Sequence, residues 1–159
     1  MSAKKQPSTL ASNRKARHDF SILEVFEAGI VLSGSEVKSL RTGQVQLADA
    51  YARIHNGELW LEGVHVAPYQ FAHGVGAHDP NRPRKLLLHS AQIQTLAERV
   101  ARERLTIVPL SIYLKDGRVK VEIALAKGKR REDKRQAIAK RDVEREIQRN
   151  LGRQEKGKN

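Results

Sequence analysis

The 159-residue sequence contains no cysteine and few aromatic residues: three Phe, three Tyr and one Trp. The absence of cysteine excludes disulfides, iron–sulfur clusters and thiol nucleophiles, and it fits the reducing cytoplasmic location that we expect. So few aromatic side chains argue against a stacking platform for single-stranded nucleic acid. Since no stretch approaches the ~20 apolar residues of a membrane helix, and the first 17 residues hold no apolar run, we expect neither a membrane span nor a signal peptide.

The positive charge of the chain lies at its two ends. The formal net charge is +12, of which +5 falls in residues 1–17 and +7 in residues 127–159, whereas residues 18–126 are neutral overall. A charge excess confined to the ends is typical of a surface that binds a polyanion. Nucleic acid fits better than an anionic membrane, because neither end carries a strong Trp, Phe or Leu face.

Short turn sequences predict two hairpins in the neutral middle of the chain. Asn56-Gly57 separates the runs YARIH and ELWLEGV, and Asp116-Gly117 interrupts a second apolar region between residues 106 and 126. Both pairs supply the positive φ angles that a type I′ turn needs. Upstream, residues 20–32 predict either two short strands or one strand with a bulge at Gly29.

Two helices are predicted between these strands. The first spans residues 34–41 with Ser33 or Ser35 as its cap, and the second begins at the capping residue Ser90 and carries apolar residues at helical spacing. The polar stretch 68–83 predicts a long loop, and loops of this length are usually functional or disordered.

These elements predict a mainly β fold: a small closed barrel of the oligonucleotide-binding (OB) type, with about six strands and one or two helices. A split sheet covered by helices is the alternative. We expect a flexible basic arm over 1–17, the barrel over 18–126 and a basic tail over 127–159. The tail is predicted to be disordered when free and helical on a partner, because its apolar stripe is narrow. That stripe consists of Ala139, Val143, Ile147 and Leu151.

An enzyme is not predicted. His18-Asp19 resembles an acid–base pair, and the histidines at 65, 73 and 78 with Asp79 resemble metal ligands, but their spacing matches no zinc pattern. Adjacent residues of a strand also point to opposite sides. No nucleophile with a visible base is present, so we expect no catalytic residue, no metal and no cofactor. A metal-dependent nuclease that uses His18 and the loop histidines remains the enzyme hypothesis to test.

Two polar features have alternative interpretations. Glu36 is either a helix N-terminal carboxylate stabilised by the dipole, or a group that orients a basic neighbour or accepts from a base. The run NRKAR at 13–17 is either a solvated tail or a nucleic-acid contact, with the Asn13 amide reaching base edges or phosphates.

Three blocks of the sequence resemble the bacterial small protein B family. They are NRKARHDFSILEVFEAGIVLSGSEVKSLR (13–41), KLLLH (85–89) and ALAKGKRREDKR (124–135), and their order and spacing match as well. The resemblance implies an OB-like barrel that binds the tRNA-like domain of transfer-messenger RNA. It also implies delivery, with elongation factor Tu, to stalled ribosomes for trans-translation, which rescues the ribosome and tags the nascent peptide for proteolysis.

The resemblance also implies site residues. Its amino-terminal and E-V-K-S-L-R motifs assign RNA binding to Asn13, Arg14, Lys15, His18, Glu36, Lys38 and Arg41. Its tail motif assigns contacts with the small-subunit decoding centre and the message channel to Lys127, Gly128, Lys129, Asp133, Lys134 and Arg135.

One position departs from this pattern, because Glu132 stands where family members often have His before D-K-R. An acid there should repel ribosomal phosphate, which puts the role of that position in doubt. A resident ribosomal protein or a general RNA-binding module is the other hypothesis, since both combine basic tails with a small β body.

Overall fold

The computed structural model describes residues 8–69, 77–129 and 141–151. The chain divides into two compact units, residues 1–128 and 129–159, and each is described by itself. The elements of the first unit are β1 (Ser8–Ser12), α1 (Arg14–Asp19), β2 (Phe20–Ile30), α2 (Gly34–Arg41), β3 (Val45–Gln46), β4 (Tyr51–His55), β5 (Glu58–Glu62), β6 (His65–Val66), β7 (Arg84–Leu87), α3 (Ser90–Glu103), β8 (Thr106–Lys115) and β9 (Arg118–Gly128).

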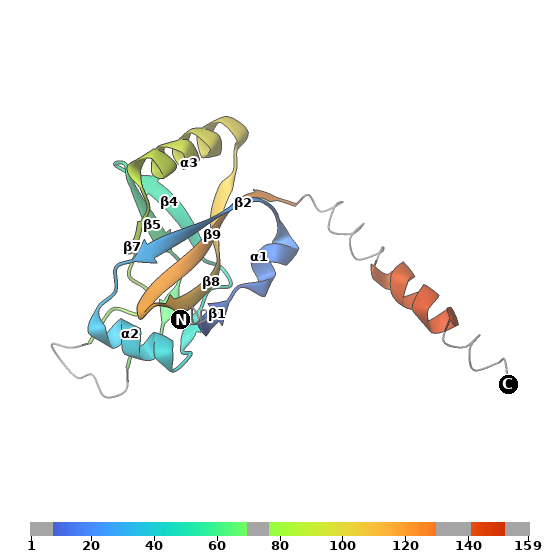
Figure 1. Ribbon diagram of the computed structural model, residues 1–159, viewed down its shortest axis with the longest axis horizontal. Coiled ribbons are helices and arrows are strands. Elements are labelled where there is room, and N and C mark those ends of the chain that lie inside the picture. The colour runs from blue at the N-terminus through green and yellow to red at the C-terminus, as the bar shows by residue number, and fades with distance from the viewer. Residues whose placement is uncertain (1–7, 70–76, 130–140, 152–159) are drawn as a thin grey trace, which may run out of the picture. The chain divides into compact units, whose positions relative to one another are not determined.

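Six antiparallel strands close into a barrel. Their order is β8-β4-β5-β7-β2-β9, and a long pairing of β8 with β9 closes the ring (Figure 1). This confirms the predicted mainly β, OB-like fold rather than the split sheet. Strand closure removes exposed sheet edges and leaves one interior for the core.

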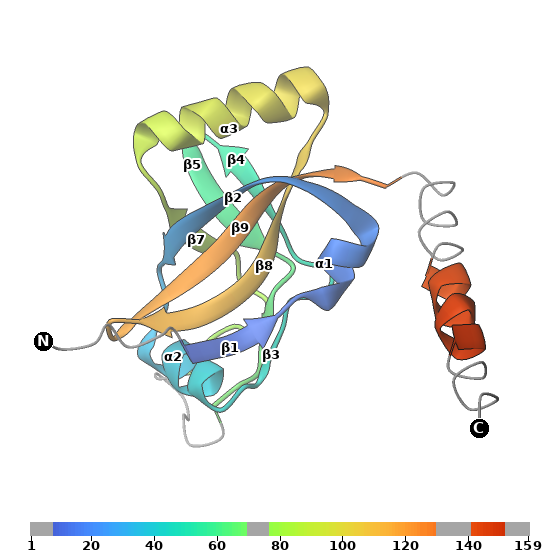
Figure 2. The ribbon, with the colours of Figure 1, turned by 45° about the vertical axis from the view of Figure 1, so that its right-hand side comes forward.

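The barrel interior is filled by the alternate residues of its strands. Leu59 and Leu61 of β5 and Ile123 and Leu125 of β9 have no exposed surface. Helix α3 lies across one end of the barrel, where its Leu96 is also fully buried, and α2 lies at the other end (Figure 2). The two helices therefore complete the core, and α2 leaves its outer face at one rim of the barrel.

Both predicted hairpins are confirmed. Asn56 and Asp116 adopt φ angles of 51°, and the glycines after them adopt 74° and 75°. The region 20–32 forms one strand, β2, which ends at Ile30. Its irregularity in pairing with β9 lies between Ile22 and Glu24, not at Gly29, so the expected position of the bulge was wrong.

The predicted flexible arm is partly ordered, which corrects that expectation for residues 8–17. Strand β1 pairs with β8, and α1 follows at once. Ala16 packs on the outer face of the barrel against Val108 and Ala124. A strand this short shows little periodicity in the sequence, and it is recognised only by its pairing with β8.

Helix boundaries differ from prediction in one detail. Ser33 caps α2 as expected, but the N-cap of α3 is His89, without a side-chain hydrogen bond, rather than Ser90. In the second unit, residues 141–151 are helical. Among the described residues, no helix has the length and apolar character needed to cross a membrane.

Candidate nucleic-acid interface

Helix α2 is fixed at its first turn by a capping box. The Ser33 hydroxyl accepts from the backbone N–H of Glu36, and the Glu36 carboxylate accepts from the backbone N–H of Ser33. Such reciprocal bonds satisfy two of the donors that a helix N-terminus leaves unpaired. The E-V-K-S-L-R motif therefore begins at a rigid point.

Glu36 lies at the centre of a buried charge cluster. Its carboxylate has no exposed surface, and it accepts hydrogen bonds from the guanidinium groups of Arg82 and Arg84. Burial raises the pKa of Glu36, but the bonds from Arg82, the Ser33 N–H and Arg84 outweigh burial and lower this pKa to about 2. Glu36 therefore orients basic neighbours, and it has no free surface through which a base amino group could donate to it.

The remaining cations of the motif are exposed. The Lys38 ammonium lies 5.5 Å from the centroid of the Tyr69 ring, within cation–π range. Ser39, which lies between Lys38 and Arg41 in the sequence of α2, donates to the Ala67 carbonyl at 2.7 Å. Arg41 is exposed in the last turn. Helix α2 thus presents two positive side chains to solvent from a well-anchored base.

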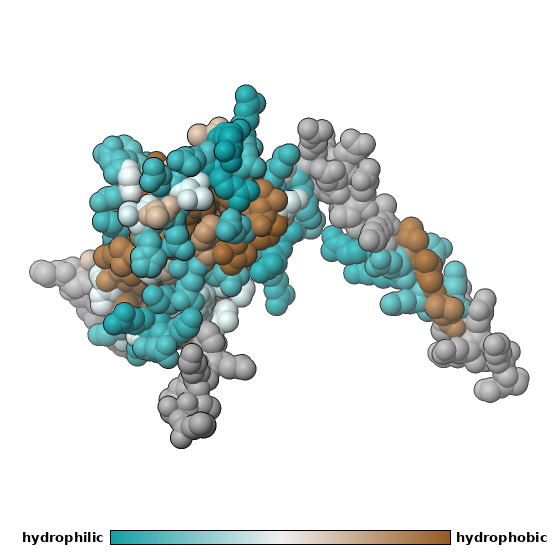
Figure 3. Space-filling model, turned by 45° about the horizontal axis from the view of Figure 1, so that its top comes forward, coloured by the Kyte–Doolittle hydropathy of each residue, from teal (hydrophilic) through white to brown (hydrophobic). Residues whose placement is uncertain are grey.

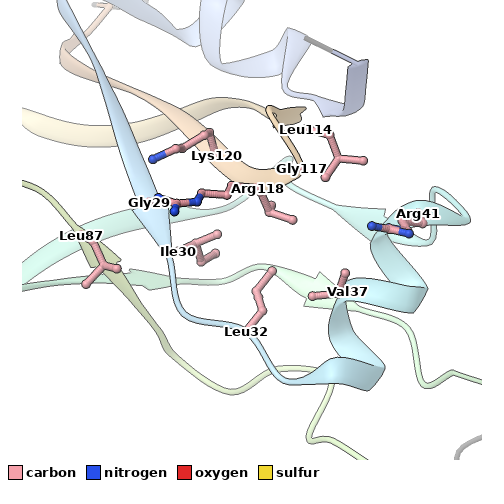
Figure 4. A pocket seen from close by; sticks show the side chains of 11 residues that line it. Gly29, Ile30, Leu32, Val37, Arg41, Leu87, Leu114, Gly117, Arg118 and Lys120 are labelled. Atoms are coloured by element: carbon pink, nitrogen blue, oxygen red, sulfur yellow. The ribbon is translucent and has the colours of Figure 1, made fainter.

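A pocket of about 320 Å³ lies between α2, the end of β2 and the β8–β9 hairpin (Figure 4). Arg41 reaches it from α2, and Arg118 and Lys120 reach it from β9. None of the described residues that line it is acidic. Its apolar side chains are Ile30, Leu32, Val37, Leu87, Leu114 and Val119.

A second pocket of about 340 Å³ shares Gly29, Leu87 and Lys120 with the first and is also lined by Glu27. The Glu27 carboxylate accepts from the Tyr113 hydroxyl at 2.5 Å and from the Lys115 ammonium at 3.2 Å. The Tyr113 bond is the main reason why the pKa of Glu27 is lowered. An ionised acceptor therefore stands beside a basic, partly apolar surface.

The amino-terminal candidates have different surroundings. Asn13 is buried, and it caps α1 by accepting from the Ala16 N–H while its amide donates to the carbonyls of Leu47 and Pro109. It is committed to internal bonds, so the interpretation of Asn13 as a direct base or phosphate contact is not supported. Arg14, by contrast, is exposed.

The other basic side chains of α1 pair with acids of the body. Lys15 lies 2.8 Å from Asp49, and His18 Nδ1 lies 3.0 Å from Asp19. The side chains of Lys15 and Asp49 are more than half exposed, and that of His18 is 46% exposed. Exposed pairs of this kind are weak, so Lys15 and His18 are available to exchange partners.

Of the tail candidates, Lys127 and Gly128 continue β9 and pair with Ser21 and Phe20, so the strand runs past the predicted boundary at residue 126. Lys129 follows directly, while Glu132 and the candidates Asp133, Lys134 and Arg135 lie outside the described residues. The helix over 141–151 carries a row of exposed apolar side chains, which Figure 3 draws in brown. They are Val143, Ile147 and Leu151, each more than half exposed.

The histidine hypothesis gains no support from the described residues. Among them, no group of three or more His, Cys, Asp or Glu could hold a metal ion. His65 bonds to Asn81, and His78 bonds to Ser35 and to the Val66 carbonyl. His73 lies outside the described residues.

Several residues of this surface were missed by sequence reasoning. Arg118 and Lys120 stood in a predicted strand, and Arg82 and Arg84 stood at the end of a predicted loop. No local pattern distinguished them, because their role depends on the closure of the barrel. Leu87 carried a usable signal, since it belongs to KLLLH, and it is 51% exposed although apolar.

The fold and this surface define a small OB-type β-barrel with a basic, pocketed rim, a class of protein that binds nucleic acids. The model of the family described as SmpB protein matches residues 10–153. The chain belongs to this family.

Similar proteins carry consistent names. An SsrA-binding protein of Mycolicibacterium smegmatis is 56% identical over 99% of this chain and 97% of its own length. One of Desulforudis audaxviator is 54% identical over 92% and 95%. A solved structure described as "tmRNA-SmpB: a journey to the center of the bacterial ribosome" shares 48% identity, with a TM-score of 0.64 over 80% of this chain and 93% of the other.

Proposed function

We propose that this protein binds the tRNA-like domain of transfer-messenger RNA and delivers it, with elongation factor Tu, to stalled ribosomes for trans-translation. The observation that carries the proposal is the family match over residues 10–153, joined to a basic pocketed rim on an OB-type barrel. The nascent peptide is then tagged for proteolysis and the ribosome released. The protein acts by binding and supplies no catalytic group.

The RNA surface is centred on the pocket between α2 and β9. Arg41, Arg118 and Lys120 neutralise phosphates, while the apolar lining accommodates an unstacked base. Lys38 extends the positive surface along α2. Shape and phosphate recognition of this kind suits a folded RNA and requires few aromatic side chains.

Helix α1 adds a second set of contacts. Arg14, Lys15 and His18 face solvent and can reach phosphates once the bond of Lys15 to Asp49 is exchanged. Asn13 and Glu36 support binding from inside, by holding α1 and α2 in place.

The tail acts on the ribosome rather than on transfer-messenger RNA. Lys127, Gly128 and Lys129 lead from the barrel into the segment that carries Asp133, Lys134 and Arg135. We infer that these residues contact the decoding centre and the message channel, and that the exposed apolar row over 141–151 becomes buried there.

The test has two arms. This protein is purified from cells through an affinity tag, and the RNA bound to it is sequenced. Transfer-messenger RNA is expected to dominate. Then binding of its tRNA-like domain is titrated for wild type, Lys120→Ala, and Arg102→Ala as a control on α3, where the side chain is 74% exposed. Each phosphate contact releases counterions on binding. Loss of one contact in Lys120→Ala should therefore make the slope of log affinity against log salt concentration shallower by about 0.7 to 0.9.

Two results together would instead identify a resident ribosomal protein. Only ribosomal RNA would be recovered, and the protein would remain on the ribosome at one copy after a high-salt wash. Equal slopes for Lys120→Ala and wild type would remove Lys120 from the RNA surface.

A further inference from the structure

The Arg82 side chain joins two elements of the barrel rim. Its Nη2 donates to Glu36 Oε1 at 2.5 Å and to the Val31 carbonyl at 3.3 Å, and its Nε donates to the same carboxylate oxygen at 3.1 Å. Val31 directly follows β2, and Glu36 lies in the first turn of α2. A planar guanidinium holds such partners in one geometry, which an ammonium does not.

The joined elements form adjacent walls of the pocket. The end of β2 contributes Gly29 and Ile30, and α2 contributes Val37 and Arg41 (Figure 4). Only three residues, 31–33, connect the two elements. The bridge from Arg82 is therefore a direct side-chain link between the α2 wall, which carries Arg41, and the end of β2.

Arg82 and Arg84 divide the work at Glu36. Arg84 is fully buried, bonds to the other carboxylate oxygen, and donates to the carbonyls of Val64 and Pro80. Arg82 bonds to Oε1 and Arg84 to Oε2, so the pair of Arg84 with Glu36 does not depend on Arg82. Arg82, with a side chain 34% exposed, lies at the solvent-facing side of this charge cluster. Replacement of Arg82 therefore leaves the buried charge paired.

We propose that Arg82 is a positioning residue for RNA binding, which acts by holding α2 against the end of β2 so that Arg41 meets phosphate. This inference rests on the proposed function of the pocket. It assigns to Arg82 an effect through Arg41, not a phosphate contact of its own.

The test is a double-mutant cycle in the full chain, with the tRNA-like domain of transfer-messenger RNA as the probe. Arg41→Ala is combined with Arg82→Lys, which preserves charge, and separately with Arg82→Gln. The matched control is Arg53→Lys, in the pair of Arg53 on β4 with Glu62 on β5. Two Arg82 variants are used so that the proposal remains testable if one of them fails to fold. A folding defect would be seen as loss of a cooperative melt.

We expect Arg41→Ala to weaken binding about tenfold in wild type and by less than about twofold once Arg82 is replaced, because coupled residues are not additive. Arg82→Lys alone should weaken binding by roughly five- to tenfold despite its unchanged charge, and Arg53→Lys should have no effect. Hydrogen exchange over 34–41 should become faster in Arg82→Lys.

Additive effects of the two substitutions, or wild-type affinity of Arg82→Lys, would overturn the positioning role. Failure of the wild-type protein to prefer this RNA over an unrelated folded RNA would instead overturn the proposed function.

Discussion

At the scale of single residues, the buried carboxylate of Glu36 is the most demanding feature of the molecule. A buried charge is tolerated only when it is paired and hydrogen-bonded, and here two arginines and a backbone N–H meet that need. Removal of the carboxylate would leave Arg84 buried without its counter-ion. The same cluster holds the first turn of α2, so we expect both stability and RNA binding to depend on this one carboxylate.

Glu36→Gln is expected to destabilise the protein at neutral pH by about 3 kcal/mol, since one partner of a buried ion pair loses its charge. The folded pKa of Glu36, about 2, lies below the usual 4.5, so its stabilisation is complete above pH 4.5 and is lost as pH falls toward 2. Urea unfolding of wild type and variant should therefore converge across that window.

The matched control is Glu98→Gln, an exposed acid of α3. It should unfold like wild type at every pH. A constant difference between wild type and Glu36→Gln from pH 7 to pH 2 would show that the ionised carboxylate is not what stabilises the fold.

At the scale of elements, α1 combines a structural residue with exposed cations. Asn13 caps α1 and anchors it to Leu47, directly after β3, and to Pro109 of β8, while Arg14 and Lys15 face solvent. We therefore expect this short helix to make two separable contributions, one to folding and one to RNA binding.

Asn13→Ala should lower the free energy of unfolding by about 1 to 2 kcal/mol, because an N-cap and two buried amide bonds are lost. It should leave the salt slope of RNA binding unchanged. Arg14→Ala with Lys15→Ala should do the reverse: thermal stability near wild type, and a slope shallower by about one or two contacts.

Denaturant unfolding and RNA titration at several salt concentrations separate the two cases. A shallower slope for Asn13→Ala would return Asn13 to the RNA surface. An unchanged slope for the double variant would remove the α1 cations from it.

At the scale of the whole molecule, a barrel and a tail of different composition divide the chain. The barrel unit ends at residue 128, where β9 ends. A chain ending at Gly128 retains every β9 pair, whereas one ending at residue 126 would lose the pairs of Lys127 and Gly128.

A chain truncated after Gly128 should fold cooperatively and retain most of its affinity for transfer-messenger RNA, yet fail to support peptide tagging on stalled ribosomes. The isolated segment 129–159 should show little helix by circular dichroism, since a short helix without a partner is marginal. Ile147→Pro in the full chain should also impair tagging, because proline breaks a helix interior at a cost of about 3 kcal/mol.

Tagging and RNA binding are measured side by side in a reconstituted system. Tagging that survives truncation would refute the separate role of the tail. Loss of RNA binding in the same chain would place the tail in the RNA site. Leu96→Ala serves as a folding control, since it opens the core without touching either surface.

The sequence by itself determined the hairpin turns, the helix over 34–41, the mainly β class and the concentration of charge at the two ends, whereas the choice of Ser33 over Ser35 as the cap came from the structure. Each depends on neighbouring residues, as Asn56-Gly57 shows by adopting the positive φ angles that its turn demands. The family motifs added the RNA hypothesis, which stands on residues 13–41, 85–89 and 124–135 together.

Only the tertiary structure decided which side chains meet. The partners of Glu36 lie 46 and 48 residues away, and Arg41 and Lys120 share a pocket because β2 pairs with β9. Asn13 was a candidate RNA contact, but its amide is buried and bonds to the carbonyls of Leu47 and Pro109, which lie 34 and 96 residues away. Barrel closure is a long-range property, so local periodicity could not show these partners.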